Sequence, residues 1–193
     1  MISMQDERTA WDRRYREGSH ASLDPDSFLT ESYKDFIQPL FRNGGTALDV
    51  AGGVGRHSIW LARRGWQVTL TDISEVGIAK ARANADSFAE RIEFQVSDVS
   101  SFEAGRQQYD LIVVFFYLER KIFPEIVKAL KPGGLLLYKT YTRLHPKFGR
   151  GPTHPMHLLE ENELLRAFSE LTVLHYHETV RDRGVAEFAG RKP

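Results

Sequence analysis

The stretch Ala47-Leu-Asp-Val-Ala-Gly-Gly-Val-Gly-Arg-His57 decides the fold of this chain. An apolar run ends here in three closely spaced glycines, and a segment with helical character follows at once. This order predicts a strand, a tight turn and a helix. Glycine allows a positive φ and leaves no side chain between the backbone and a bound molecule. Ligands of open α/β sheets bind at the carboxyl ends of the strands, so we expect a ligand at this turn.

Acidic residues follow the next two predicted strands. Asp72 ends the first of them, 19 residues after Gly53, and a carboxylate there can accept hydrogen bonds from both hydroxyls of a ribose. Asp72 could instead cap the following helix, but Ser74 already serves as an N-cap, so ribose binding is favoured. Asp98 follows the next strand and can accept from an adenine amino group. A plain loop aspartate fits Asp98 about as well.

Strands and helices alternate along most of the chain. We predict helices over residues 6–16, 27–41, 56–64, 74–86, 122–130 and 160–169, and strands over 46–51, 66–71, 91–96, 109–115 and 135–140. Two more strands, 171–180 and 185–190, are separated by only four residues, which cannot supply a parallel crossover. The expected fold is therefore α/β, a Rossmann-like, doubly wound, seven-stranded sheet, mostly parallel with a C-terminal antiparallel hairpin.

Length and composition limit the classes of function. The 193 residues suffice for one domain with a substantial core, and we expect a single domain over residues 1–193. Lys plus Arg equals Asp plus Glu, 26 each, so no nucleic-acid partner is expected. The absence of cysteine excludes disulfides and thiolate metal sites. No apolar stretch approaches the roughly 20 residues of a membrane span, so we expect a cytoplasmic protein without a membrane partner.

Five motifs in order carry a family resemblance. The segments 49–55, Asp72, Asp98, 109–115 and Leu130-Lys-Pro-Gly-Gly134 resemble the motif set of class I S-adenosylmethionine-dependent methyltransferases. Within that class, Trp11-Asp-Arg-Arg-Tyr-Arg-Glu-Gly18 and Tyr117-Leu-Glu-Arg-Lys-Ile-Phe-Pro124 are similar to segments of small bacterial enzymes of the tellurite-resistance and thiopurine-methyltransferase type. The resemblance runs over nearly the whole chain.

The resemblance implies S-adenosylmethionine as cofactor and S-adenosylhomocysteine as product. The backbone of the glycine turn would approach the methionine moiety, Asp72 the ribose and Asp98 the adenine, while residues 1–40 would form a helical cover. The residues implied in cofactor binding are Trp11, Tyr15, Asp49, Ala51, Gly52, Gly53, Gly55, Arg56, Asp72, Ile73, Asp98, Val99 and Phe115.

The acceptor end is expected after the fourth and fifth strands. Residues 142–156 form a long loop with prolines, glycines and histidines, and we interpret it as a substrate loop. His154 and His157 suggest a metal site but lack a third ligand, so no metal is expected. Transfer by in-line displacement needs no covalent intermediate, and no catalytic residue is assigned. The residues expected in the substrate pocket are Phe116, Tyr117, Tyr141, Phe148, Arg150 and His154.

The leading interpretation is methyl transfer from S-adenosylmethionine to a small-molecule acceptor, by a monomer or homodimer. Ala51 stands where the class usually has glycine, and Phe115-Phe116 stand where related enzymes often have a polar residue. A protein that binds the cofactor without catalysis is therefore an alternative. An NAD(P)-dependent oxidoreductase is less favoured, because the glycines do not fit G-x-G-x-x-G.

Overall fold

The computed structural model describes residues 4–99, 104–149 and 151–193. The chain divides into two compact units, Met1–Phe102 and Glu103–Pro193, which are described separately below. The expectation of one domain over residues 1–193 stays a prediction.

Seven strands form the sheet, in the order β3-β2-β1-β4-β5-β7-β6. The strands are β1 (Thr46–Val50), β2 (Gln67–Asp72), β3 (Ile92–Val96), β4 (Tyr109–Phe115), β5 (Leu130–Tyr141), β6 (Thr172–Thr179) and β7 (Val185–Arg191). β2 pairs in parallel with β1 and β3, and β4 pairs in parallel with β5, whereas β7 runs antiparallel to both β5 and β6. The predicted α/β fold with a C-terminal antiparallel hairpin is confirmed.

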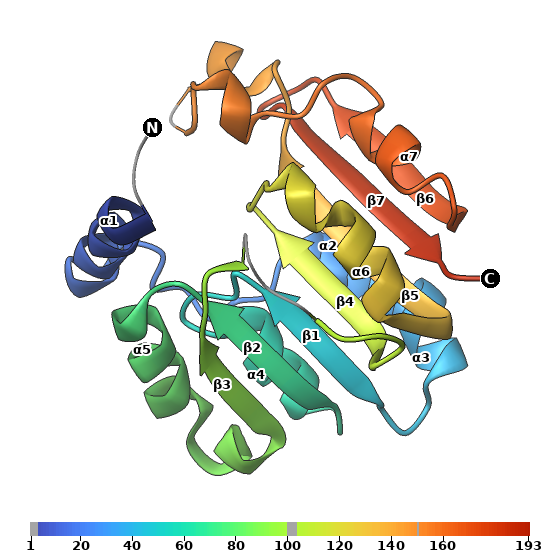
Figure 1. Ribbon diagram of the computed structural model, residues 1–193, viewed down its shortest axis with the longest axis horizontal. Helices are drawn as coiled ribbons and strands as arrows, with labels where there is room; N and C mark the ends of the chain where they lie inside the picture. The colour runs from blue at the N-terminus through green and yellow to red at the C-terminus, as the bar shows by residue number, and fades with distance from the viewer. Residues whose placement is uncertain (1–3, 100–103, 150) are drawn as a thin grey trace. The chain divides into compact units, whose positions relative to one another are not determined.

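In the first unit, helices α4 (Arg56–Ala62) and α5 (Glu75–Ala85) lie beside β2 and β3 (Figure 1). Apolar side chains of strands and helices meet in a core in which Leu48, Leu70 and Trp66 are fully buried. Ser74 caps α5 as predicted, since its side chain accepts a hydrogen bond from the Gly77 amide at 3.0 Å. The core thus fixes β1 and β2 with their carboxyl ends at one edge.

Helix α1 (Met4–Arg16) begins the first unit, and a second helical region follows it. Asp26 is the predicted N-cap of that region and accepts from the Phe28 amide at 2.9 Å. The helix predicted over residues 27–41 is divided into α2 (Ser27–Ser32), a π-helical turn η1 (Tyr33–Ile37) and α3 (Gln38–Leu40). The helical path continues across all three segments, and only the hydrogen-bond spacing changes at η1.

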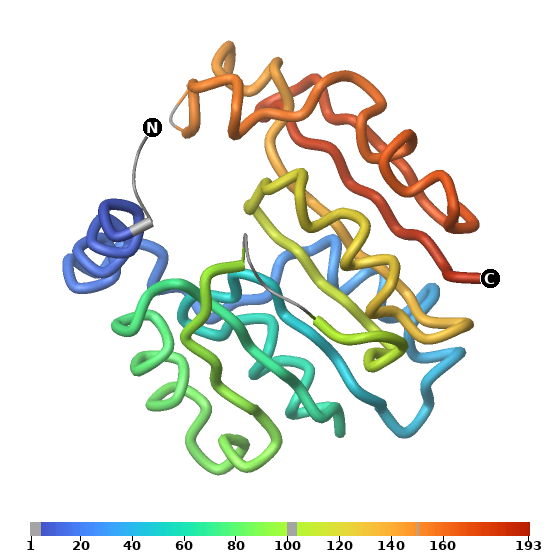
Figure 2. The backbone as a smooth tube through the Cα atoms, viewed as in Figure 1, coloured from blue at the N-terminus to red at the C-terminus, as the bar shows by residue number. Residues whose placement is uncertain are grey.

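The second unit packs α6 (Phe123–Ala129) and α7 (Glu163–Ala167) with the strands β4, β5, β7 and β6, and Figure 2 traces the hairpin in orange to red. Four aromatic side chains form the centre of its core. Phe168 lies 5.1 Å from Phe123, 5.9 Å from Tyr138 and 5.5 Å from Phe188, measured between ring centroids. Burial of such rings dominates core energetics.

Strand β5 begins five residues earlier than the sequence predicts. The sequence analysis leaves residues 131–134 between a predicted helix and a predicted strand, but Pro132, Gly133 and Gly134 lie inside the strand. Tyr109 pairs with Leu130 and Leu111 with Leu135, so β5 carries extra residues in a bulge. Gly133 has φ +80, and a Cβ on Gly134 would lie 3.1 Å from the Tyr109 carbonyl oxygen. Proline and glycine therefore serve a bulge here rather than a helix end.

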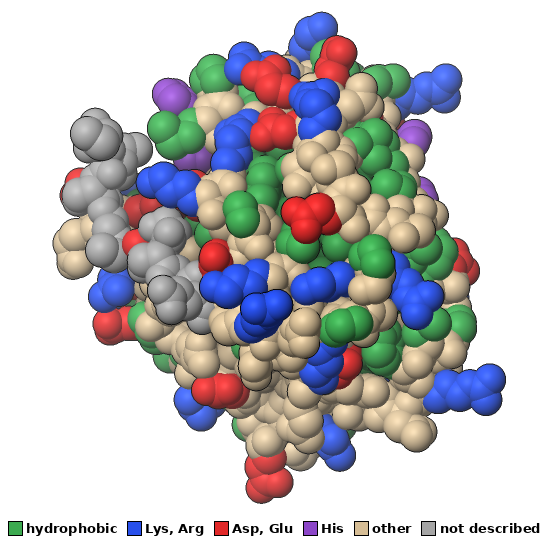
Figure 3. Space-filling model, turned by 45° about the vertical axis from the view of Figure 1, so that its right-hand side comes forward, with side chains coloured by type: hydrophobic (Ala, Val, Ile, Leu, Met, Phe, Trp, Pro, Cys, Tyr) green, Lys and Arg blue, Asp and Glu red, His purple; other side chains and the backbone are tan. Residues whose placement is uncertain are grey.

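The remaining short segments are η2 (Asp86–Arg91), η4 (Arg120–Ile122), η5 (His145–Lys147) and η6 (Pro155–His157), all 3₁₀ helices. Within the described part of the chain, every helix is too short or too polar to cross a membrane. Lys and Arg side chains are interspersed with Asp and Glu on the face drawn in Figure 3.

Candidate active site

The glycine turn between β1 and α4 has a left-handed backbone. Ala51, Gly53 and Gly55 have φ values of 55°, 57° and 84°. Gly52 donates its amide to the Thr71 carbonyl oxygen at 3.1 Å, which ties the turn to the end of β2. A positive φ is ordinary for glycine and strained for alanine, so Ala51 is held in place by its surroundings.

Asp72, the last residue of β2, holds this turn directly. Its Oδ2 accepts from the Gly53 amide and its Oδ1 from the Ser74 amide, both at 2.9 Å. The side chain is buried, and burial raises the pKa of Asp72 to about 6, against the opposing effect of these two hydrogen bonds. Ser74, not Asp72, is the N-cap of α5, and the bond from its amide to Asp72 holds that cap residue in place. Each carboxylate oxygen has about two acceptor positions, so these bonds leave capacity for a ligand.

Asp49 is buried beneath the same turn. Its Oδ2 accepts from the Ser58 amide at 3.1 Å and from the Ser58 hydroxyl at 2.6 Å. Burial raises the pKa of Asp49 to about 6, although both bonds from Ser58 favour the charged form. Asp49 thus connects β1 to the first turn of α4, directly beneath the glycine turn.

Each of the three glycines in the turn stands where a side chain would collide with a different neighbour. A Cβ atom on Gly52 would lie 2.8 Å from the Asp49 carboxylate, and one on Gly55 would lie 3.0 Å from Cβ of Ala81. A Cβ on Gly53 would lie 2.5 Å from the phenol oxygen of Tyr15. Tyr15 therefore covers the turn at Gly53, where the sequence predicts a ligand.

Helix α1 is fastened to the start of α5. Oδ1 of Asp12 accepts from the Ser74 hydroxyl at 2.5 Å and from the Val76 amide at 3.2 Å, and Lys80 donates to the Tyr15 carbonyl oxygen. The sequence analysis missed Asp12 and Lys80. Asp12 lies on the helix predicted over residues 6–16 and Lys80 on the helix predicted over residues 74–86, and the sequence gives no signal that these two helices are in contact.

The rings of Trp11 and His20 lie close to Tyr15, and the positive charges of Arg14 and Arg56 act on it. The ring centroids of Trp11 and Tyr15 are 5.6 Å apart, and those of Trp11 and His20 are 5.5 Å apart. Burial lowers the pKa of His20, and the charges of Arg14 and Arg56 lower it further. Burial raises the pKa of Tyr15, and the negative charge of Asp72 acts in the same direction. The predicted residues Trp11, Tyr15 and Arg56 thus gather at one place.

The predicted adenine residues lie along the same strand edge. Asp72 pairs with Val96, the last residue of β3, and the Ser97 amide donates to the Asp72 carbonyl oxygen at 2.9 Å. Asp98 comes next and is half-buried, and Val99 is buried. Ile73, half-buried, directly follows Asp72.

The predicted acceptor residues belong to the second unit, as does Phe115, the last residue of β4. Phe116 and Tyr141 meet, with ring centroids 5.0 Å apart, and His145 lies 4.1 Å from Tyr141. The carbonyl oxygen of Tyr117 accepts from the Tyr138 hydroxyl at 3.0 Å.

Phe148 is exposed, and Arg150 lies outside the described residues. Exposed His154 caps η6 by accepting from the Met156 amide, and its ring centroid lies 6.1 Å from that of His157.

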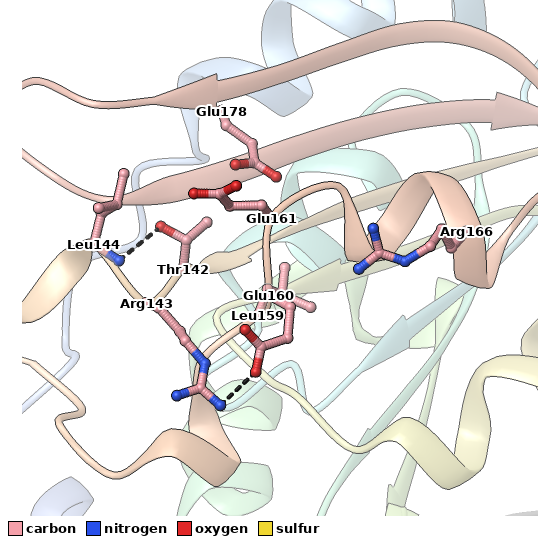
Figure 4. Close-up of a pocket in the computed structure, with 8 residues that line it drawn as sticks. All are labelled: Thr142, Arg143, Leu144, Leu159, Glu160, Glu161, Arg166 and Glu178. Atoms are coloured by element: carbon pink, nitrogen blue, oxygen red, sulfur yellow. Dashed lines mark hydrogen bonds and ion pairs between the residues drawn. The ribbon is translucent and has the colours of Figure 1, made fainter.

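A cavity of about 440 Å³ in the second unit opens beside the start of the predicted substrate loop (Figure 4). An ion pair between Arg143 and Glu160 forms part of its wall, and Glu161 and Glu178 point their carboxylates toward one another. The substrate residues expected from the sequence do not line it. Its lining residues are Thr142, Arg143, Leu144, Leu159, Glu160, Glu161, Arg166 and Glu178.

Comparisons with known proteins bear on this arrangement. Residues 47–134, which contain the glycine turn, Asp72 and Asp98, match the family described as a methyltransferase domain. The structure is similar to that of TehB from Haemophilus influenzae, with a TM-score of 0.71 and 20% identity. The superposed residues cover 93% of this chain and 66% of TehB. Residues 47–134 therefore form a methyltransferase domain. The resemblance to class I S-adenosylmethionine-dependent methyltransferases that the five motifs carry is confirmed by this match and this fold.

Two further proteins are similar to this chain. The ubiquinone/menaquinone biosynthesis C-methyltransferase UbiE of Acidiphilium cryptum is 33% identical over an alignment of 107 positions, which covers 51% of this chain and 43% of that protein. The [4+2]-cyclase SpnF shares the fold with a TM-score of 0.75 and 18% identity, over 99% of this chain and 96% of that one. The matched segment of this chain spans about half the length of the curated relatives.

The residues at the glycine turn fit the ribose end of S-adenosylmethionine, the cofactor that the resemblance implies. Buried Asp72 is a hydrogen-bond acceptor at the end of β2, and Gly53 places backbone without a side chain beside it. Ala51 adds one methyl group at a position with φ 55°. Tyr15 forms the outer wall over Gly53.

Proposed function

We propose that this chain transfers a methyl group from S-adenosylmethionine to a small-molecule acceptor. The hydrogen bond from the Gly53 amide to Asp72 Oδ2, at 2.9 Å, carries this proposal. It joins a glycine turn after β1 to an acidic residue at the end of the neighbouring parallel strand. Sheets of this class bind ligands at that edge.

Asp72 would accept hydrogen bonds from the ribose hydroxyls while the Gly53 and Ser74 amides hold its carboxylate in place. Asp98 and Val99 would bind the adenine, with Ile73 packed on its face. Ala51, Gly52, Gly53 and Gly55 would present backbone to the methionine moiety, and Arg56 would attract its carboxylate. Trp11 and Tyr15 would cover the cofactor from α1. The part of Phe115 in cofactor binding stays a prediction of the resemblance.

The chemistry supplied by the cofactor is an electrophilic methyl group on a sulfonium. The chain would hold the acceptor atom in line with that bond and exclude water. Positioning of this kind can lower a barrier by roughly 7–11 kcal/mol without a covalent intermediate. A general base is needed only for an acceptor that is protonated at working pH.

Turnover of S-adenosylmethionine tests the proposal. We expect S-adenosylhomocysteine to form with at least one member of a panel of thiols, phenols, amines and tellurite. Asp72→Ala should abolish turnover, whereas Asp86→Ala, at the far end of α5, should retain it. A protein that binds S-adenosylhomocysteine but turns over no acceptor would support the alternative, a cofactor-binding protein without catalysis.

A further inference from the structure

A second cluster of chemically useful side chains lies at the carboxyl edge of β4 and β5, within the second unit. Phe116 directly follows β4, and Tyr141 ends β5, its parallel neighbour. Because β7 runs antiparallel to β5 and Val185 pairs with Tyr141, Arg183 reaches the same edge just before β7 begins. Three segments distant in sequence thus meet where ligands of such sheets bind.

Aromatic rings form the floor of this cluster. The Phe116 and Tyr141 ring centroids lie 5.0 Å apart with planes at 43°, and both residues are half-buried, so part of each ring faces solvent. Buried His145 backs Tyr141 at 4.1 Å. Phe116 has φ 59°, a strained value for a bulky residue, and its amide donates to the Lys139 carbonyl oxygen at 2.7 Å. Strain of this kind is concentrated at functional sites.

Positive charge approaches the floor from two sides. The Lys139 ammonium and the Arg183 guanidinium each lie 5.8 Å from the Phe116 ring centroid. Buried Lys139 is paired with Glu187 at 2.9 Å, while Arg183 is exposed. Lys139, Glu187 and Arg183 carry a summed charge of +1 around the Phe116 ring, which favours an anion over a cation at this ring.

The turn that carries Arg183 is anchored rather than free. The Thr142 amide donates to the Gly184 carbonyl oxygen at 2.9 Å. A Cβ on Gly184 would collide with the His145 amide nitrogen and would lie 2.7 Å from the Leu144 carbonyl carbon. Glycine therefore lets the hairpin turn sit directly against the chain that leaves β5, and this contact holds Arg183 near Phe116.

We propose that Phe116, Tyr141 and Arg183 form a subsite for a planar, anionic acceptor. Its flat body packs on the exposed parts of the two rings, and its negative group binds the planar fork of Arg183, while Lys139 adds positive potential behind the ring. Arg183 is then a residue that selects the acceptor. The inference rests on the proposed methyl transfer, whose acceptor it narrows to a class.

Three probes that share a ring and differ in charge test this subsite: benzoate, benzamide and benzylamine. Their Kd values would be measured by NMR titration on the full chain saturated with S-adenosylhomocysteine. We expect benzoate to bind at least about tenfold more tightly than benzamide and benzylamine to bind most weakly. Arg183→Gln should remove the preference for benzoate, and Arg183→Lys should keep part of it, because lysine retains the charge but not the fork.

Arg181→Gln is the matched control, since it removes the same charge from the same exposed turn, and it should leave the preference largely unchanged. Equal binding of the three probes, no binding of any of them, or an equal loss in both variants would overturn the subsite. S-adenosylhomocysteine binding is measured first on each protein. Its absence from the unmutated chain would instead overturn the proposed function.

Discussion

The phenol oxygen of Tyr15 lies 2.5 Å from the point where a Cβ atom would stand on Gly53. A helix near the start of the chain therefore closes the glycine turn after β1, and the turn accepts it only because residue 53 has no side chain. Gly53 also has a left-handed backbone, with φ 57°, and this conformation is a second reason for glycine at this position.

Gly53→Ala should destabilise the fold by about 1–3 kcal/mol, from the left-handed φ and from the collision with Tyr15. Gly18→Ala is the control, because Gly18 has φ 80° but nothing within 4 Å of its Cβ position. Urea denaturation should show a smaller loss for Gly18→Ala, and Tyr15→Phe should recover part of the loss at residue 53. Equal losses at both glycines would disprove the contact.

Ala51→Gly should change the free energy of unfolding by between zero and a gain of about 1 kcal/mol, because Ala51 has φ 55°, which glycine adopts without strain. Ala79→Gly gives the contrast, since Ala79 is exposed inside α5 and glycine costs about 1 kcal/mol there. Thermal unfolding of both variants measures the difference. A loss at residue 51 as large as that at residue 79 would contradict the strained backbone.

Asp12→Ala should loosen α1, because Asp12 accepts from both the Ser74 hydroxyl and the Val76 amide at the start of α5. Loss of such a cap costs about 1–2 kcal/mol. Amide hydrogen exchange should accelerate in α1 and in the first turn of α5. Glu17→Gln, exposed just beyond α1, should leave exchange as in the unmutated protein, and unchanged protection in Asp12→Ala would refute the attachment.

Stability should respond to pH through Asp49. Burial raises its pKa from 3.8 to about 6, so between these values the folded chain binds more protons than the unfolded chain. The contribution of Asp49 to the free energy of unfolding therefore falls as pH rises from about 4 to about 6, and is constant above that. Relative to Asp49→Asn, the unmutated protein should lose up to about 3 kcal/mol across this window. Parallel pH profiles of the two proteins would contradict the raised pKa.

Phe168→Ala should destabilise the second unit by about 3–5 kcal/mol, because Phe168 is fully buried among Phe123, Tyr138 and Phe188. Phe148→Ala removes the same side chain from an exposed position and should change stability by less than about 0.5 kcal/mol. Chemical denaturation followed by circular dichroism compares them. Similar losses would place Phe168 outside the core.

The fold was predictable because its elements follow local rules. The apolar run before Gly52 forms β1, Ser74 caps α5, and the four residues between 180 and 185 allow only an antiparallel hairpin. Pro132-Gly133-Gly134 misled the prediction of β5, because these residues disfavour a helix and also suit a bulge. Only pairing with β4 selects the bulge.

The sequence indicated that Asp72 lies beside the glycine turn, because both follow the ends of neighbouring strands, and the structure has them in contact. The binding roles of the site residues stay predictions. Contacts between distant segments gave no signal in the sequence. Asp12 is an ordinary helix residue until α5 is placed beside it, and Arg183 looks like a solvated turn residue until Phe116 lies under it. The subsite proposed for the acceptor could therefore not be predicted from the sequence, because its residues come together only in the folded chain.

The most direct test of the central claim is isothermal titration of the protein with S-adenosylhomocysteine, with NADH as the control ligand and Asp72→Ala as the control variant. The structure predicts binding of S-adenosylhomocysteine alone, and its loss in Asp72→Ala while the variant remains folded by circular dichroism. Binding of neither ligand, or binding of S-adenosylhomocysteine that survives Asp72→Ala, would contradict the role of the glycine turn and Asp72 as the cofactor site.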